Sequence, residues 1–305
     1  MVLWVLTILM VIVMSFSFMA RTETLATLAF KERMEKKFLA EAGIQRGVQE
    51  ILYMKQNPQL AQIEGSDTGS DIWKTDGTPY SGRLGEGDYA VRITDESGKI
   101  DINTLNDTSG IILKTLLINM GVQDENADTI VDSILDWKDA DDLVRLHGAE
   151  SDYYMSMSNP YKAKNANFDT LEELVLVKGM SYDIFFGNEG KKGLVDLITI
   201  NSNMNIINVN AAPKEVLMAV PGITPEIADA IISYRQNKKI MNVQEVGIPP
   251  QSAPYIGIAD GNTFAVEALG HRGEEKKGYP IKAVVTLEGD KYKYLYYKSP
   301  AAASQ

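Results

Sequence analysis

The sequence predicts an α+β fold in which a long N-terminal helix supports an antiparallel sheet and a helical region lies between two groups of strands. Three observations lead to this prediction. A helical pattern runs unbroken through residues 1–57, strand-like alternation occurs near residues 88–103 and 263–298, and the region between these two groups is helical and repeats itself. Separate strand groups around a helical stretch are typical of α+β proteins.

The N-terminal segment is long and apolar enough to cross a membrane. Residues 1–20 (MVLWVLTILMVIVMSFSFMA) carry no charge, and as a helix they would span about 30 Å. No basic residue precedes the run, which favours a retained anchor over a cleaved secretory signal. Beyond Arg21, apolar residues recur at three- and four-residue intervals and no proline occurs until Pro58. This pattern predicts one long helix whose second half lies on a partner or on the chain's own domain.

Composition excludes several classes of function. The chain has 305 residues, of which 45% are apolar, so it can form an anchor and about two domains. Its net charge of −11 disfavours a nucleic-acid partner. There is no cysteine and there are only two histidines. Thiolate metal sites, cysteine nucleophiles and multi-histidine sites are therefore disfavoured.

The strand groups follow from turn residues and alternation. Residues 58–87 are rich in glycine, serine, aspartate and proline and indicate a loop or short hairpin. Residues 88–93 and 99–103 alternate on either side of a Glu-Ser-Gly turn, which predicts two paired strands. Residues 263–269, 281–287 and 291–298 form the second group, with a hairpin between the last two.

The helical region contains two similar units. The sequence from Gly121 (GVQDENADTIV) aligns with that from Gly222 (GITPEIADAII), and upstream IDINT at Ile100 aligns with INVNA at Ile207. This predicts two copies of a strand followed by a helical hairpin. The second copy resembles a helix-hairpin-helix motif, but Thr224 replaces its second glycine and acidic residues follow. Because phosphate capture needs a free helix N-terminus, we expect a packing turn rather than a nucleic-acid site.

An acidic loop follows the first unit. Residues 136–154 (DWKDADDLVRLHGAESDYY) hold six carboxylates. Such a cluster is either solvated or neutralised by a hard cation, and calcium fits better than zinc or magnesium. Leu143 and Val144 occupy positions that an EF-hand reserves for a ligand and a glycine, so the loop is not an EF-hand. A carboxylate hydrolase is a distant alternative, since no substrate-pocket signal accompanies the acids.

Several stretches together resemble the minor pseudopilin K family of the bacterial type II secretion system. They run in family order over most of the chain, and residues 136–180 are the most specific part. The stretches are VLWVL at Val2, FLAEAGIQRGV at Phe38, ITDESGKIDINT at Ile93, DWKDADD at Asp136, HGAESDYY at His147, NPYKAKNANFDTLEELVLVKGM at Asn159 and INVNAAPKEVLMAVPG at Ile207.

The resemblance implies a pilin-like fold, with the long helix on an antiparallel sheet domain and an inserted helical domain of helix-hairpin-helix-like (SAM-like) repeats. The expected parts are a transmembrane and stem helix at 1–57, the first part of the sheet domain at 58–103, the inserted helical domain at 104–205, and the second hairpin unit with the remaining strands at 206–305.

The resemblance also implies a function without catalysis. Such a protein lies at the tip of a periplasmic pseudopilus, nucleates assembly with minor pseudopilins I and J, contacts other pseudopilins and supports protein export across the outer membrane. Contact with secreted cargo is a further implication. The apolar face of the stem would meet the partner helices through Leu25, Leu28, Leu39, Ile44, Val48 and Ile51.

The family's calcium-binding region coincides with the acidic loop. Carried onto this sequence, it implies a calcium cofactor and the ligands Asp136, Asp139, Asp141, Glu150 and Asp152, of which Asp136 is the weakest choice.

The implied location is the bacterial inner membrane, crossed once by residues 1–20, with the bulk of the chain in the periplasm. Arg21, Lys31 and Arg33 follow the apolar run and would by themselves favour a cytoplasmic bulk. Family precursors carry a basic leader that ends in glycine. We expect such a leader upstream of Met1, where its charge would reverse the orientation. The family member K also lacks an early glutamate, and no acidic residue precedes Glu23 here.

Overall fold

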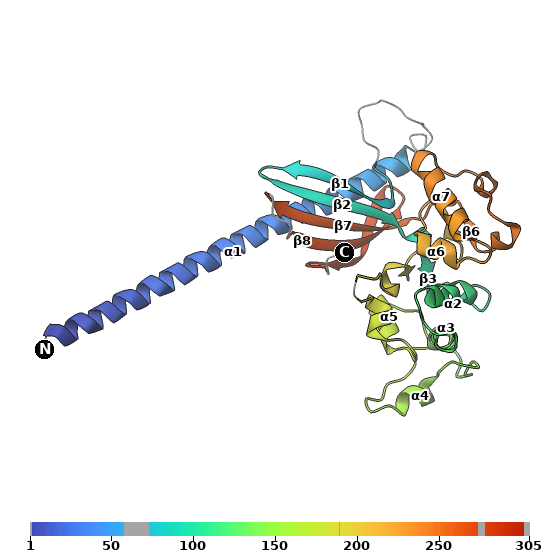
Figure 1. The fold of residues 1–305 in the computed structure, drawn as a ribbon, viewed down its shortest axis with the longest axis horizontal. Coiled ribbons are helices and arrows are strands. Elements are labelled where there is room, and N and C mark those ends of the chain that lie inside the picture. Colours follow the sequence, from blue (N-terminus) through green and yellow to red (C-terminus); the bar gives the residue numbers. More distant parts are fainter. Residues whose placement is uncertain (1, 58–72, 189, 274–277, 302–305) are drawn as a thin grey trace.

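The computed structural model describes residues 2–57, 73–188, 190–273 and 278–301. One helix projects from the body, a sheet packs on its second half, and a helical domain lies at the far end of that sheet (Figure 1). This arrangement confirms the predicted combination of a long N-terminal helix, an antiparallel sheet and a helical domain.

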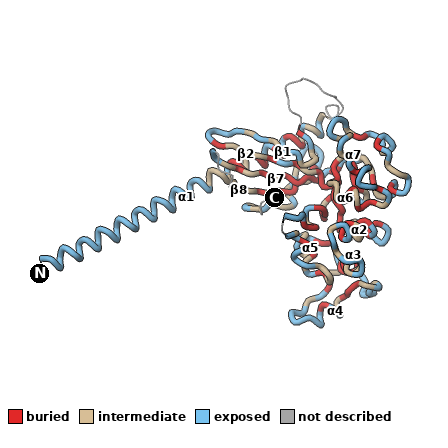
Figure 2. Tube along the Cα trace, in the orientation of Figure 1, coloured by how far each residue is buried: buried red, intermediate tan, exposed pale blue. Residues whose placement is uncertain are grey.

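Helix α1 (Val2–Gln56) is a single element of 55 residues. Its end just before Pro58 agrees with the restriction that proline places on the residue preceding it. The most apolar window has a mean hydropathy of 2.5 and none of it is buried, so length and composition suit a membrane span. Figure 2 shows the change along the helix, from an exposed first half to a second half with a buried side.

The central sheet has five antiparallel strands in the order β1-β2-β7-β8-β9. The strand pattern predicted near the C-terminus is confirmed, including the hairpin between the last two strands. Strand β1 fills part of the segment expected to be a loop or short hairpin and pairs with β2. The strands are β1 (Asp76–Leu84), β2 (Gly87–Asp95), β7 (Thr263–Arg272), β8 (Tyr279–Glu288) and β9 (Lys291–Lys298).

The predicted pairing of residues 88–93 with residues 99–103 is wrong. Strand β2 pairs with β1 and β7, whereas β3 (Ile100–Asp101) pairs in parallel with β4 (Ile198–Thr199). The cause is Asp95, whose buried carboxylate accepts the N–H of Ser97 at 2.9 Å and that of Gly261 at 3.0 Å. These bonds turn the chain out of the sheet and fix the point where it returns.

The helical domain is therefore an insertion between β2 and β7. Its hydrophobic core includes residues from Ile100 to Ile256, whereas the sheet and α1 share a separate core. Both expected boundaries, at 103/104 and 205/206, fall inside the inserted domain. Its first part contains β3, α2 (Gly110–Asn119), α3 (Asp124–Lys138), α4 (Ser151–Met155), α5 (Tyr182–Phe186) and β4, and its second part contains β5 (Ile207–Asn208), α6 (Lys214–Ala219), α7 (Pro225–Asn237) and β6 (Ile256–Gly257). Short 3-10 turns join them: η2 (Glu96–Gly98), η3 (Leu171–Leu176), η4 (Leu194–Asp196), η5 (Val243–Val246) and η6 (Pro250–Ser252).

The predicted internal repeat is confirmed and extends further than expected. Each unit starts with a strand, continues into a helical hairpin, and ends in a short strand that pairs in parallel with the first. The hairpin turns contain Gly121 and Gly222, with φ of 96° and 87°, a region that favours glycine. A third turn of this kind, at Gly179 (φ 84°) before the cap Ser181, was not predicted.

An asparagine at the same position of each unit closes the loop behind the hairpin. The Asn103 amide accepts the N–H of Phe168 at 2.8 Å and donates to its carbonyl at 3.0 Å. The Asn210 amide does the same to Ile240, at 2.9 and 3.0 Å. Because both backbone groups of the distant residue are satisfied by one side chain, each unit is tied at this point.

Helix α1 approaches the sheet closely at two glycines. A Cβ at Gly270 of β7 would lie 2.0 Å from the carbonyl oxygen of Lys36, and a Cβ at Gly47 would lie 2.7 Å from Val266. At Gly270 the obstacle is helix backbone, which cannot turn aside as a side chain can. The interface therefore depends on the absence of a side chain there.

We expect Gly270→Ala to push α1 off β7 and to lower the free energy of unfolding by about 1–3 kcal/mol, the usual cost of overpacking. His271→Ala is the matched control because residue 271 is only partly buried. Chemical denaturation of the two variants measures the difference. Equal midpoints would show that the helix tolerates displacement at this point.

Candidate metal centre

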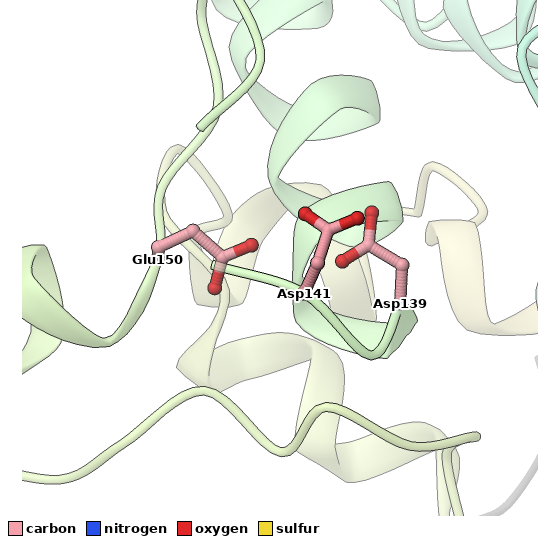
Figure 3. Close-up of side chains that lie close together, drawn as sticks. All are labelled: Asp139, Asp141 and Glu150. Atoms are coloured by element: carbon pink, nitrogen blue, oxygen red, sulfur yellow. The ribbon is translucent and has the colours of Figure 1, made fainter. Parts of the chain in front are cut away.

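Three of the predicted ligands gather where α3 ends. One oxygen from each of Asp139, Asp141 and Glu150 lies within 4.8 Å of the others. Figure 3 shows their carboxylates facing one another, with Glu150 reaching across from the chain segment before α4. The C-terminal end of α3 positions Asp139 and Asp141, and the N-terminal side of α4 positions Glu150.

Three carboxylate oxygens of this group lack hydrogen-bond partners. Asp139 Oδ1 and both carboxylate oxygens of Glu150 are buried without a donor, and the same holds for Asn165 Oδ1. A buried acceptor left unpaired costs free energy, and an unpaired charge costs more. The three carboxylate oxygens belong to residues of the gathered group, so a hard cation there would satisfy them. Asn165 approaches the loop through its amide nitrogen, which donates to the carbonyl oxygen of Asp141 at 3.5 Å and to the carboxylate of Asp142 at 3.4 Å.

The electrostatics of Glu150 agree with this geometry. Burial, followed by the neighbouring charges of Asp136 and Asp139, raises the pKa of its carboxyl from 4.5 to about 7. Only 2% of the residue is exposed. Negative charge therefore gathers around a buried carboxylate, and a cation would relieve the repulsion.

Asp136 lies outside the gathered oxygens, contrary to the expected ligand set. Its fully buried carboxylate accepts Arg145 Nη1 at 2.8 Å and the backbone N–H of Arg145 at 3.2 Å. Burial raises the pKa of Asp136, and the hydrogen bonds from Arg145 oppose that shift. The carboxylate is thus already paired with a guanidinium, and its role is to hold the loop against α3.

Asp152 also lies outside the group. It is exposed in the first turn of α4, where a carboxylate favours a helix N-terminus without any metal. Tyr154 of the same helix is fully buried and fixes the orientation of α4, and this orientation leaves Asp152 exposed.

Arg145 contacts both Asp136 and Asp139, and so connects Asp136 to the gathered group. Its Nη1 also lies 2.5 Å from Asp139 Oδ2, while its Nε lies 3.4 Å from Asp107. One oxygen of Asp139 is therefore held by the guanidinium and the other faces Asp141 and Glu150 unpaired. This division orients the carboxylate toward the site.

Aromatic packing gives the site a firm base. Trp137 is buried and meets the ring of Tyr154 edge-on at 5.2 Å between centroids. Lys178 Nζ donates to the carbonyl oxygens of His147 and Gly148 at 3.2 and 2.9 Å. Both ends of the acidic loop are therefore fixed to the helical domain before any ion is considered.

In the structure, the stem residues expected to meet a partner fall into an exposed group and a covered group. Leu25 and Leu28 are exposed, at 56% and 51%. The other four are covered by the chain's own sheet, which corrects the expectation that they face another subunit. These four are Leu39, Ile44, Val48 and Ile51.

Comparison with known proteins gives a family for the central region. The family of type II secretion system (T2SS) protein K matches residues 98–185, which include the acidic loop, and a helix-hairpin-helix family matches residues 202–247. The second match covers the second of the two repeated units.

Relatives of this chain carry the same description. Type II secretion system protein K of Pseudomonas aeruginosa is 29% identical over 179 residues, which are 56% of this chain and 51% of the relative. Protein K of Pectobacterium carotovorum subsp. carotovorum is 25% identical over 182 residues, 54% of this chain and 56% of the relative. The matches thus span about half the length of these curated relatives.

The fold has a counterpart among solved structures. A chain in the crystal structure of the GspK-GspI-GspJ complex from enterotoxigenic Escherichia coli superposes with a TM-score of 0.60 at 17% identity. The superposition covers 85% of this chain and 98% of that chain. This protein therefore carries a type II secretion system protein K domain within a GspK-like fold, and its curated relatives are protein K sequences.

Proposed function

We propose that this protein is a minor pseudopilin of a type II secretion system, which caps the pseudopilus together with minor pseudopilins I and J and supports export across the outer membrane. The observation that carries the proposal is the protein K domain, mounted beside a sheet on a helix whose first half is uncovered. The role requires no catalytic site. The GspK-like fold supports the choice of partners, because the solved counterpart comes from a complex with GspI and GspJ.

The uncovered half of α1 needs an apolar environment. Its large side chains from Val2 to Met19 are all well exposed, and burying apolar area contributes about 25 cal/mol per Å². Two environments would supply that burial, a bilayer before assembly and partner helices after it. We place the helix in the inner membrane and the bulk of the chain in the periplasm.

The corrected stem surface gives the partner test. Along α1, Leu25 and Leu28 lie between the apolar run and the part that the sheet covers. We propose that Leu25 and Leu28 contact helices of I and J. Their exposed apolar side chains would then be packed between the subunits. Other pseudopilins and secreted cargo are further proposed contacts.

We also propose calcium as the ion of the candidate metal centre. Asp139, Asp141 and Glu150 would hold it, with backbone carbonyl oxygens and waters completing the shell. Calcium accepts six to eight oxygen ligands in flexible geometry, which suits carboxylates drawn from a loop. The ion would tie the end of α3 to the start of α4.

Nucleic-acid binding is the alternative that the second hairpin unit raises. Its helix α7 begins with a cap, because Thr224 Oγ accepts the N–H of Ile227 at 3.4 Å. Phosphate capture needs such N–H groups free. Glu226 in the first turn would repel a phosphate further. We therefore assign the hairpin to packing.

Partner contact through the stem is tested with Leu25→Asp and Leu28→Asp in the full chain. We expect each change to reduce co-purification with I and J, because a charge would enter an apolar contact. Thr27→Asp is the control, since residue 27 lies on another side of the helix. Undiminished co-purification of both variants would remove this surface from the complex.

Metal binding is tested by thermal unfolding in detergent. Calcium at about a hundredfold excess over its dissociation constant should stabilise the protein by about 2.7 kcal/mol relative to chelator. Glu150→Gln should abolish this gain, and Asp152→Asn should keep it because Asp152 lies outside the gathered oxygens. A gain that survives Glu150→Gln would place the ion elsewhere.

The effect of calcium should depend on pH. Because the pKa of Glu150 rises from 4.5 to about 7 on folding, the metal-free protein should lose stability as pH increases through that interval. Calcium binds the ionised carboxylate, so its stabilising effect should grow over the same interval. The difference in Tm between calcium and chelator should thus be larger at pH 8 than at pH 5. A difference independent of pH would show that Glu150 is not a ligand.

A further inference from the structure

Strand β9 forms an open edge of the central sheet. The order β1-β2-β7-β8-β9 leaves β9 with one neighbour among the described residues. The opposite edge, β1, contains Pro79 next to a register shift, features that interrupt strand addition. Strand β9 (KYKYLYYK) has no proline, and its register with β8 is regular from Lys291 to Tyr294.

The hairpin register shows which backbone groups face outward. Glu288 and Lys291 flank a two-residue turn at Gly289, whose φ is 64°. Residues that flank such a turn form a hydrogen-bonded pair, so Tyr292 and Tyr294 fall at positions that direct N–H and C=O away from β8. The regular register continues through Tyr294, and Leu295 then bulges between Tyr294 and Tyr296.

The two faces of β9 differ in chemistry. Tyr292 donates to Gln45 of α1 at 3.3 Å, and Gln45 donates to Tyr294 at 3.0 Å, so these rings cover the helix side. Lys291 and Lys293 alternate with them and lie on the other face. Both lysines are exposed, and neither forms an ion pair with any residue that the structure describes.

The charges select the kind of strand that fits. Opposite charges across neighbouring strands are favourable and like charges are not. A second copy of β9 would place lysine against lysine. A strand with acidic side chains at every second position would instead meet Lys291 and Lys293, with Lys298 available beyond the bulge. Glu288 already stands opposite Lys291, so Lys293 offers the less compensated charge.

We propose that the outer edge of β9 is a docking site for an extended acidic segment of a partner protein, which adds a sixth strand to the sheet. The backbone groups of Tyr292 and Tyr294 supply the hydrogen bonds, and the lysines supply the charge selection. This contact lies on the sheet and is independent of the exposed stem of α1. It can therefore fail without affecting the proposed role in secretion.

The test uses the full chain in detergent micelles and labelled peptides that alternate glutamate and valine. Fluorescence anisotropy should show binding, and hydrogen exchange should show new protection at the amides of Tyr292 and Tyr294. The double variant Lys291→Glu/Lys293→Glu should weaken binding by about tenfold. The exposed Lys162 gives the matched control, because Lys162→Glu changes charge far from β9 in the sequence and should leave binding unchanged.

A charge-swapped peptide keeps the test informative. A peptide alternating lysine and valine should bind the double variant better than the wild type and protect the amides of Tyr292 and Tyr294, and that protection also demonstrates that the variant is folded. Absence of binding by the acidic peptide would overturn the proposal. Binding without protection of the two amides would also overturn it, since electrostatic attraction alone needs no added strand. Binding that does not depend on the charge of the peptide or of β9 would overturn it as well.

Discussion

The close approach of α1 to the sheet is the contact on which the remaining structure depends. Helix backbone lies against β7 at Gly270, and the apolar side of the second half of α1 fills one face of the sheet. Because the sheet covers only that half, the rest of the helix has no partner within the described chain. The same helix must therefore serve as a core element at one end and as an interface at the other. That division explains why residues of similar apolar character, such as Leu28 and Ile44, have opposite surroundings.

The insertion depends on a second constraint, at the junction between the domains. Asp95 accepts N–H groups from Ser97 and Gly261, which brings the exit and the return of the chain together. A buried pair, Lys99 with Glu96 at 2.8 Å, lies next to this turn. Since both ends of the insertion are held at one place, the helical domain can be large without disturbing the register of β2 with β7.

The sequence carried enough information for the helix, the C-terminal strands and the repeat, because each has a strong period. It was insufficient where a single side chain decides the path, as at Asp95, and for β1, where Pro79 and two glycines break the alternation. Three of five expected ligands came together, but Asp136 is taken by Arg145. The pairing of Arg145 with Asp136 was missed because a single basic residue in an acidic loop has no periodic signal. The stem residues could not be divided either, since an apolar stripe does not reveal what covers it.

The asparagine ties of the two repeated units have a consequence for the place of the candidate metal centre in the fold. In the second unit α7 ends at Asn237, and the tied residue Ile240 follows almost at once. In the first unit α3 ends at Lys138, but the tied residue is Phe168, and residues 139–167 lie in between. The acidic loop thus lies in a connection that is far longer in the first unit than in the second, at a position where both flanks are already anchored. Such a position permits the segment to vary in length and sequence while the packing of the unit is kept.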